Sequence, residues 1–551
     1  MAGFTVSRFN WNNIEIKIRN SQPATRNSQL VTRPQDTVSS IEKIMHNLNL
    51  KYYKYLLAAI SGLVLTTAFP KIGWSYLAWI AFVPFFAAIH GETPRHSLLM
   101  GFVMGICHHV TLFYWIVGVC HTYGRLPVVV AVAIMLLLAG YLSLYTALFA
   151  LLLNKFREKS IDFTISAPIL FPSLEFIRSF LLTGFPWEQL GHSQFAQIPL
   201  LQSADLFGVY GLSALIIFAN AAIFVVGERY KKEKCITWRP LVIVIVLIIA
   251  FWGYGLQRIK EIDKIAEGET HKKVTLVQGN IDQSLKWNPA YQKKTIKRYI
   301  ELTRSAQPAE RDLTVWPETA LPFYFLRDVV LTKMVLQNIQ GIKGYLLAGS
   351  PSCIWKNGKP VYLNSAYLIA PDGAVVGRYD KTHLVPFGEY VPLRNWFPFL
   401  GKIVESVGDF TAGEKGQVLI WEGNPIGILI CFETIFPDLA RELKKNNASL
   451  FITITNDAWF GRSSAPYQHL SMATFRAVEN RVAIARAANT GISAFIDPAG
   501  RITRQTSLLQ TTTLSASVPL MHVKTWYTRF GDTFPMTCLL IMCCVIWWKK
   551  T

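Results

Sequence analysis

The chain has 551 residues, enough for two or three domains, but 51% of them are hydrophobic, only 16% are charged, and they include 16 Trp and 34 Phe. Such a composition indicates that part of the chain lies in lipid. The net charge of +20 does not indicate nucleic-acid binding, because no basic run is interleaved with aromatic residues and no zinc-finger or RNA-binding signature is present. A bilayer with anionic headgroups is the simpler partner for that charge.

Residues 1–50 are polar and lack the uninterrupted apolar core that a signal peptide needs. We interpret them as a disordered extension, with Met45 as an alternative start. A chain that begins at Met45 is therefore expected to insert and to be active, as measured by membrane fractionation and an activity assay. Loss of activity without loss of expression would show that the extension has a role of its own.

Eight apolar segments are the next feature along the chain. Most reach the roughly 17–25 residues that a helix needs to cross about 30 Å of hydrocarbon. They lie at residues 55–70, 73–90, 97–118, 127–153, 164–182, 207–227, 240–256 and 534–548. The sequence thus predicts a transmembrane domain of about seven helices over 51–257 and one C-terminal transmembrane helix over 531–551.

Lysine and arginine are distributed unequally between the short loops of this predicted domain. If the N-terminus is cytoplasmic, the loops on the opposite side carry only Lys71 and Arg125, and residues 183–210 contain no Lys or Arg. The inside loops hold the rest. They carry Lys51, Lys54, Arg95, Lys155, Arg157, Lys159, Arg229, Lys231, Lys232, Lys234, Arg239, Lys549 and Lys550. The positive-inside rule then places both termini in the cytoplasm and residues 258–530 on the far side.

Residues 258–530 have the pattern of an α/β domain. Short β-branched or apolar runs alternate with amphipathic stretches such as 289–306 and 468–488. Near-continuous apolar runs are typical of strands buried on both faces. The predicted strands are Val274 to Leu276, Leu313 to Val315, Tyr345 to Ala348, Ile426 to Ile430, Leu450 to Thr455 and Ile492 to Ile496. A layered α/β domain of about 270 residues follows.

In three places a strand-like run ends and a reactive side chain follows. Glu318 follows Leu313 to Val315 and a Trp-Pro pair, Lys381 follows Tyr379-Asp380, and Cys431 ends the apolar run Gly427 to Ile430. Each residue alone is more often a solvated carboxylate, a surface lysine or an inert buried thiol. A carboxylate, an ammonium and a thiol at three strand ends would, however, meet at one rim of a sheet.

Such a trio fits nucleophilic catalysis. A nucleophilic Cys needs a base within hydrogen-bond reach and a cation that stabilises the thiolate, so Glu318 fits the base and Lys381 the cation and oxyanion donor. Of the eight cysteines only Cys353 and Cys431 lie within 258–530, and no spacing indicates a disulfide framework or a zinc site. The chemistry requires no metal and no soluble cofactor.

The three residues stand in the order that carbon–nitrogen hydrolases of the nitrilase superfamily show, and residues 258–530 resemble that superfamily. With its apolar segments, the chain from about residue 50 resembles the apolipoprotein N-acyltransferase family of Gram-negative bacteria. The matching motifs include Val277-Gln278-Gly279-Asn280, Lys286-Trp287, Trp316-Pro317-Glu318-Thr319, Lys381 to Pro392, and Asn456 to Gly461. The resemblance implies a four-layer αββα sandwich inserted between transmembrane helices, with Glu318, Lys381 and Cys431 at the edge that faces the bilayer.

The resemblance also assigns supporting residues. Glu389 is expected to orient Lys381 or the attacking amine, and Glu433 to support the pocket, although a plain salt bridge is an equal alternative for Glu433. Phe432 stands where the family commonly has Tyr, so any hydroxyl contribution is absent there. Trp287 and Trp459 match lid or pocket aromatics, with core packing as the alternative, and Trp187 matches a bent turn near a lipid entrance.

The function implied is a two-step acyl transfer. An acyl chain passes from a phospholipid to Cys431 as a thioester, and then to the α-amino group of the diacylglyceryl-cysteine of an apolipoprotein. The family works in the inner membrane with its catalytic domain in the periplasm, and we expect a monomer. One alternative is a membrane-anchored amidase or nitrilase with the same triad, which would need only one helix. The other is a transporter, which the few ionisable residues in the helices and the lack of an inverted repeat disfavour.

Overall fold

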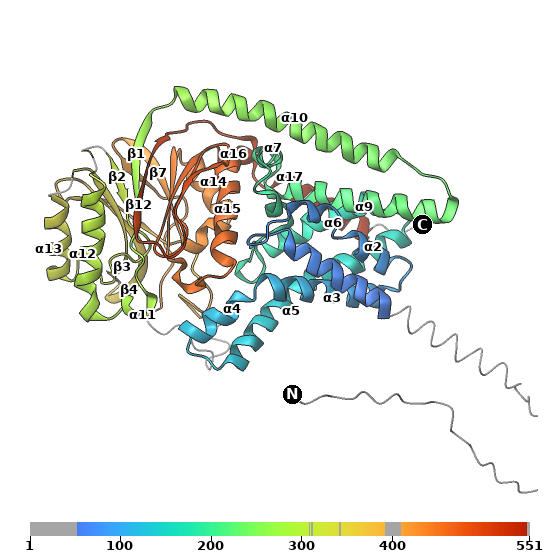
Figure 1. Cartoon of the computed structure of the whole chain (residues 1–551), viewed down its shortest axis with the longest axis horizontal. Coiled ribbons are helices and arrows are strands. Elements are labelled where there is room, and N and C mark those ends of the chain that lie inside the picture. The colour runs from blue at the N-terminus through green and yellow to red at the C-terminus, as the bar shows by residue number, and fades with distance from the viewer. Residues whose placement is uncertain (1–51, 308, 310–311, 341–342, 392–408, 548–551) are drawn as a thin grey trace, which may run out of the picture. The chain divides into compact units, whose positions relative to one another are not determined.

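The structure is a computed structural model that describes residues 52–547 except 308, 310–311, 341–342 and 392–408. The predicted extension 1–50 and Met45 lie outside the described residues. From Tyr53 onward the chain forms one compact unit, which contains a helical region and two β-sheets (Figure 1).

Every predicted apolar segment contains helix. Residues 52–67 are helical. The other helices are η1 (Ser75–Trp79), α2 (Val83–Ile89), α3 (Pro94–Leu112), α4 (Trp115–Gly118), η2 (Val119–Tyr123), α5 (Val128–Glu158), α6 (Phe163–Arg178), α9 (Val209–Glu233), α10 (Arg239–Gly268) and α17 (Thr533–Trp547). The second segment is broken into η1 and α2 because Pro84, in the first turn of α2, has no N–H to continue a helix from the preceding residues.

Length separates these helices into two groups. Within the described residues, α5, α9 and α10 are long and apolar enough to cross a membrane. A fourth span results if α3 is joined to Trp115–Tyr123 across a bend of 51°. The stretches Ser75–Ile89 and Thr533–Trp547 are apolar but shorter. Several candidate spans are therefore present, whereas the count of eight stays a prediction.

Between α10 and α17 the chain forms two six-stranded mixed sheets. The first has the order β12 (Thr512–Pro519), β1 (His271–Gln278), β2 (Leu313–Val315), β3 (Tyr345–Lys356), β4 (Lys359–Ile369) and β5 (Val375–Asp380). The second has the order β11 (Ile502–Gln505), β10 (Ala494–Ile496), β9 (Ala483–Ala488), β8 (Leu450–Thr455), β7 (Asn424–Ile430) and β6 (Val418–Trp421).

The sheets pack face to face with helices on their outer faces. Apolar side chains of both sheets, such as Leu276 and Ile428, share one buried cluster. The opposite face of the first sheet packs on α12 (Pro289–Ser305) and α13 (Val329–Gln340). The opposite face of the second sheet packs on α14 (Pro437–Lys445) and α15 (Ala465–Asn480). This four-layer order is visible in Figure 1, and it explains the near-continuous apolar strands, since each sheet is buried on both faces.

Two expectations about element boundaries differ from the structure. The amphipathic stretch 468–488 is not one helix, because α15 ends at Asn480 and residues 483–488 form strand β9. Arg481 adopts a left-handed conformation with φ 49° that ends the helix, and the small residues of β9 fit between neighbouring strands. The predicted domain boundary at 257/258 falls inside α10, which is continuous to Gly268.

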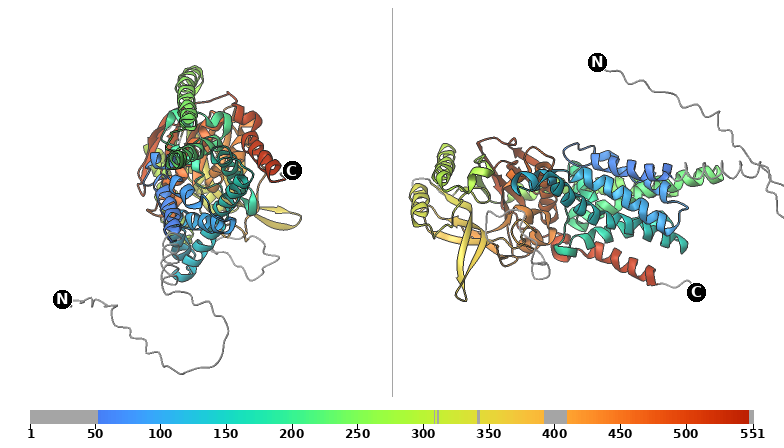
Figure 2. Two further views of the ribbon diagram at one scale, coloured as in Figure 1. Left: turned by 90° about the vertical axis from the view of Figure 1, so that its right-hand side faces the viewer. Right: turned by 90° about the horizontal axis from the view of Figure 1, so that it is seen from below.

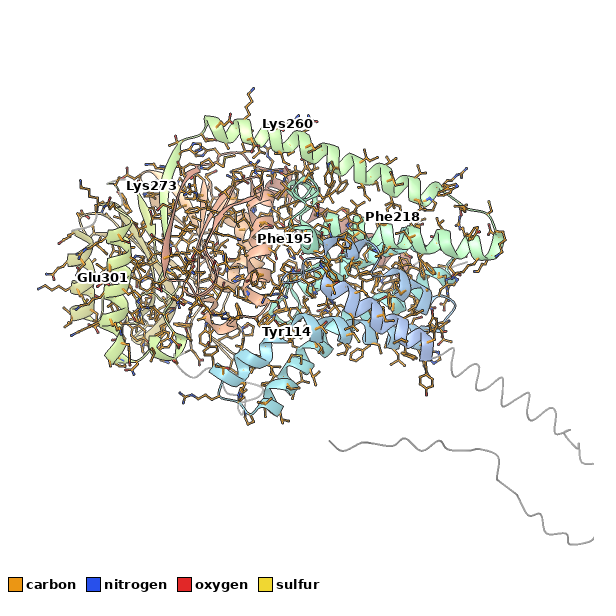
Figure 3. The ribbon with its side chains drawn as sticks, in the orientation of Figure 1. Tyr114, Phe195, Phe218, Lys260, Lys273 and Glu301 are labelled. Carbon is orange, nitrogen blue, oxygen red and sulfur yellow. The ribbon has the colours of Figure 1, made fainter. Side chains whose placement is uncertain are left out.

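Buried polar contacts join the helical region to the sandwich. Gln468 on α15 accepts hydrogen bonds from the indole nitrogens of Trp115 and Trp187, at 3.2 and 2.9 Å. Arg481 donates to Asp205 at 2.7 Å, and both residues are fully buried. Phe195, labelled in Figure 3, packs with Phe475 and other residues at the same junction. Since buried polar groups are costly unless paired, these contacts fix α15 against the helices.

Candidate active site

The three predicted catalytic residues follow the carboxyl ends of strands that share one direction within each sheet. β2 is parallel to β3, and β5 is antiparallel to β4, which is itself antiparallel to β3, so β2 and β5 run the same way. Glu318 follows β2 and Lys381 follows β5. Cys431 follows β7 of the facing sheet and opens the short helix η5 (Cys431–Ile435). Lys381 Nζ lies 3.5 Å from Glu318 Oε1, and both residues interact electrostatically with Cys431, so the structure brings all three to one site.

Glu318 is a buried carboxylate held from two sides. Its Oε1 accepts a hydrogen bond from Asn364 Nδ2 at 2.8 Å, and its Oε2 accepts one from the backbone N–H of Asn456 at 3.0 Å. Its Oε1 also lies 3.5 Å from Lys381 Nζ. The carboxylate is thus fixed in place beside a cation.

Lys381 is 1% exposed and contacts two carboxylates. Its Nζ donates to Glu389 Oε1 at 3.0 Å, in addition to its contact with Glu318. Burial alone would lower the pKa of the ammonium, but Glu389 and then Glu318 outweigh burial and raise it. Lys381 is therefore a fixed positive charge in this site.

Cys431 lies on a strained turn between β7 and η5. Its φ is 53°, in the left-handed region that non-glycine residues rarely adopt. The carbonyl oxygen of Cys431 contacts His469 Nε2 at 3.0 Å, which anchors this turn to α15. A nucleophile held in an unusual backbone conformation by surrounding contacts is typical of active sites.

The electrostatics of Cys431 decide how its thiol reacts. Burial raises the pKa of the thiol, Glu318 raises it further, and Lys381 opposes both. Because the net direction is upward, the thiol is protonated at neutral pH in the substrate-free protein. Attack on a substrate then requires that the neighbouring carboxylate of Glu318 take the proton.

Glu433 ties the Lys381 loop to the Cys431 turn. Its Oε2 accepts from the backbone N–H of Ile430, and its Oε1 accepts from the Tyr379 hydroxyl, from the N–H and hydroxyl of Thr382, and from the N–H of His383. The side chain is fully buried. Its contacts within the described residues are hydrogen bonds to two strand ends.

Replacing Glu433 by Gln is therefore expected to destabilise the protein by about 1–3 kcal/mol, since an amide N–H₂ group must face one of these buried donors. The loss is measured as a lower midpoint of thermal unfolding in detergent. Glu442→Gln is the matched control, because Glu442 is partly exposed on α14 and contacts Lys445 and Arg441. Equal midpoints for the two variants would contradict this role of Glu433.

Glu389 contacts Lys381 directly and is linked to Glu318 through Asn364. Asn364 Nδ2 donates to Glu389 Oε1 at 2.8 Å as well as to Glu318. Glu389 Oε2 accepts from the backbone N–H of Val385 at 2.8 Å. Asn364 therefore links the carboxylates on either side of Lys381. Asn364 lies within β4 and has no distinctive local pattern, so the sequence alone does not indicate its role.

The four aromatic residues singled out in the sequence lie in different settings. Phe432 packs against Phe436 and lies 6.5 Å, centroid to centroid, from Phe185 of the helical region. Trp187 is 2% exposed, and its ring stacks on His469. Trp459 is half-buried with its ring against Tyr123 of η2. Trp287 is also half-buried, and its indole nitrogen is buried without a hydrogen-bond partner among the described residues.

Two further residues beside the site carried no functional assignment from the sequence. Lys286, at the end of α11 (Gln283–Lys286), donates from Nζ to the backbone carbonyl of Glu318 at 3.0 Å. His469 Nδ1 lies 3.0 Å from Arg486 Nη2, which also donates to Asp457 at 2.8 Å. In its neutral form, His469 can therefore accept a hydrogen bond from Arg486 at Nδ1 and donate one from Nε2 to the backbone carbonyl of Cys431. Only the fold reveals these contacts, because their partners lie far away in sequence.

Cys353 lies apart from this site. It pairs with Tyr362 in the long β3–β4 hairpin, which projects from the sandwich (yellow in Figure 2). Its thiol is half-buried. Cys431 is therefore the cysteine that the strand ends bring to the candidate catalytic carboxylate and ammonium.

Comparison with known proteins divides the chain at α10. Residues 61–222 match the apolipoprotein N-acyltransferase N-terminal domain, and residues 273–528 match the carbon–nitrogen hydrolase family. A protein from Geobacter metallireducens named apolipoprotein N-acyltransferase is 44% identical over 88% of this chain and 93% of its own length. One of the same name from Haemophilus influenzae is 32% identical over 88% of this chain and 92% of its own.

Two solved structures are similar to about half of this chain. Nit3 from Saccharomyces cerevisiae, a member of branch 10 of the nitrilase superfamily, is 18% identical and covers 51% of this chain and 96% of its own, with a TM-score of 0.36. A carbon–nitrogen hydrolase from Helicobacter pylori is 16% identical and covers 50% of this chain and 95% of its own, also with a TM-score of 0.36.

Proposed function

The chain belongs to the apolipoprotein N-acyltransferase family and is an acyltransferase, and on that premise we propose the route that the acyl chain takes. Cys431 receives an acyl chain from a phospholipid and passes it to the α-amino group of the diacylglyceryl-cysteine of an apolipoprotein. The observation that carries this proposal is the convergence of Cys431, Lys381 and Glu318 beside the helical region.

In the first step, Glu318 takes the proton of the Cys431 thiol as the sulfur attacks the ester carbonyl of the phospholipid. Lys381 Nζ donates to the oxyanion that forms, and a backbone N–H near Cys431 adds a second donor. The carbon–oxygen bond breaks, and Glu318 returns the proton to the oxygen of the departing lysophospholipid. An acyl thioester remains on Cys431.

In the second step, the amine of the acceptor attacks this thioester and the carbon–sulfur bond breaks. The oxyanion again lies beside Lys381, and Glu318 transfers a proton from the nitrogen to the departing sulfur. The free thiol and a triacylated lipoprotein result. Because the first product leaves before the acceptor reacts, the kinetics are ping-pong. Glu389 keeps Lys381 oriented in both steps, and Glu433 fixes the two loops.

The substrates reach the site from the membrane. Phe432, next to the nucleophile, lies near Phe185, and Trp187 contacts α15 through Gln468. The contact of Phe432 with Phe185 supports lateral entry of lipid between the helical region and the sandwich, near the half-buried Trp287 and Trp459, whereas Trp187 is buried inside that junction. By family membership, the protein lies in the bacterial inner membrane, and we expect a monomer with about eight transmembrane helices. The distribution of basic residues places both termini in the cytoplasm and the domain between α10 and α17 in the periplasm.

The test is an incubation of the full-length protein with a phospholipid labelled in one acyl chain and a diacylated lipopeptide. The proposal predicts that label appears in the lipopeptide as a hydroxylamine-resistant amide, with one lysophospholipid formed for each amide. Release of labelled fatty acid without transfer would instead support the amidase or nitrilase alternative. If the protein bound both lipids but neither transferred nor hydrolysed the acyl chain, both the acyltransferase and the hydrolase hypotheses would be wrong.

A further inference from the structure

Lys286 is a second buried lysine beside the nucleophile. Its side chain is 1% exposed, and its Nζ lies 3.0 Å from the carbonyl oxygen of Glu318. The amine also interacts electrostatically with the Glu318 carboxylate and with Cys431. α11 is fixed at the site because Asn456, whose N–H binds Glu318, donates from Nδ2 to Gln283 at 2.6 Å. Lys286 is thus part of the active-site wall.

The two buried lysines differ in their surroundings. Lys381 contacts two carboxylates and is held positive, whereas the close contact of Lys286 is a carbonyl oxygen. Burial lowers the pKa of Lys286 to about 7, against the opposing effects of Glu318 and Cys431. A large fraction of Lys286 is therefore an uncharged amine at neutral pH, with a lone pair that can accept a proton.

The second half of the reaction produces one proton more than Glu318 can deliver. A free α-amine has a pKa of about 8, so much of the acceptor arrives as an ammonium ion with three protons. The amide nitrogen of the product keeps one of them. Of the two that leave, one goes through Glu318 to the departing sulfur of Cys431. The other needs a different acceptor.

The remaining charged groups around the thioester are already engaged. Lys381 carries its proton throughout. Glu389 accepts from Lys381, Asn364 and a backbone N–H. The pKa of the Asp457 carboxyl is lowered, against burial, by Arg486 and His469, so it is a weak base. In its uncharged form Lys286 is a base next to Glu318 and Cys431. Unlike Lys381, which stays protonated, it can accept a proton on its nitrogen.

We propose that Lys286 is a further catalytic residue, which accepts the second proton of the acceptor ammonium, directly or through one water, and releases it to solvent. This role rests on the proposed function. The titratable groups that act on Lys286 are Glu318 after β2 and Cys431 on η5, and Lys381 lies 3.5 Å from the Glu318 carboxylate. Their combined field sets the pH at which Lys286 changes charge.

The test measures the two half-reactions separately. The enzyme is first acylated with phospholipid alone, and discharge of the acyl group to a diacylated lipopeptide is then followed by mass spectrometry. In Lys286→Met, discharge at pH 7 is expected to be slower by about 10²-fold or more, the usual effect of losing a proton acceptor. Formation of the thioester, which needs no base other than Glu318, is expected to change much less. Above pH 8 the acceptor is uncharged, so discharge by the variant should recover.

Two further variants separate proton transfer from structure. Lys286→Arg keeps the charge and the donor but cannot release its proton, so its discharge should be as slow as that of Lys286→Met. Lys444→Met is the matched control, because Lys444 is also buried, has its pKa lowered by burial to about 7, and donates to the carbonyls of Met521 and Ala448 on the far side of α14. Any loss in that control should fall equally on both half-reactions.

Restoration of discharge by Arg would overturn the proposal, since it would show that a permanent charge suffices. Equal slowing of both half-reactions in Lys286→Met, or a pH profile unchanged from wild type, would also overturn it. If wild-type enzyme formed no acyl adduct but still transferred acyl chains, the thioester route itself would fail and this role with it. Because this result is measured on the wild-type enzyme, it can be told apart from the other outcomes before any Lys286 variant is tested.

Discussion

Cys431→Ala is expected to abolish acyl transfer, with a loss on the order of 10⁶-fold, as when the nucleophile is removed from a protease. The substitution removes one buried sulfur atom and leaves the contact of His469 with the backbone carbonyl in place. Alanine adopts a φ of 53° no less readily than cysteine, so the turn should keep its shape. Transfer of labelled acyl chains to a lipopeptide measures the loss.

The control for this prediction is Cys353→Ala. Cys353 lies in the β3–β4 hairpin, away from the three strand ends, and is expected to be dispensable. Thermal unfolding and lipid binding should be close to wild type in both variants. Acyl transfer by Cys431→Ala above this background would mean that another group carries the acyl chain.

Glu318→Gln is expected to slow thioester formation by about 10²- to 10⁴-fold, the usual cost of losing a general base. The amide fills the same space, but one end of it must face the N–H of Asn456 or the amide of Asn364. Lys381 keeps Glu389 as its second partner. The acyl mass gained per minute from phospholipid alone measures the effect, and a wild-type rate would rule out Glu318 as the base.

The pH dependence of this variant has a definite sign. Removing the negative charge of Glu318 takes away one cause of the raised pKa of Cys431, but burial, the larger cause, remains. The thiol of the variant therefore stays mostly protonated at neutral pH, and only the thiolate attacks. Its rate should increase about tenfold per pH unit up to the pKa of the thiol, whereas the wild-type rate should depend less on pH in that range.

Strands β1, β2, β3, β7, β8 and β10, the three motifs and the apolar helices could be predicted because each depends on a local pattern. Runs such as Leu450 to Thr455 are apolar on both faces, and only a strand buried between two layers requires that. The amphipathic stretch 468–488 contains both the end of α15 and strand β9, and its sequence does not mark the break, because small and polar residues fit both a buried helix and a buried strand. The left-handed turn at Arg481, which separates them, depends on packing against Asp205 and Gln202.

The supporting residues of the site were harder to predict. Asn364 and His469 carry no signature in the sequence around them, and Lys286 lies in the Lys286-Trp287 motif, which does not indicate a role for its amine. Their positions depend on partners 32 to 46 residues away, namely Glu318 for Asn364 and Lys286, and Cys431 for His469. Trp187, expected near a lipid entrance, is instead surrounded by Trp115, Gln468 and His469. A tryptophan in a bent turn has the same local sequence whether its ring faces lipid or a buried junction.

The most direct test of the account is the mass of the wild-type protein after incubation with phospholipid alone. The second substrate is absent, so the thioester has no acceptor and should accumulate. The account predicts a gain of one acyl chain, located on the peptide that contains Cys431, removed by hydroxylamine and released on addition of a diacylated lipopeptide. An adduct on Cys353, or transfer that proceeds while Cys431 never carries an acyl group, would contradict it.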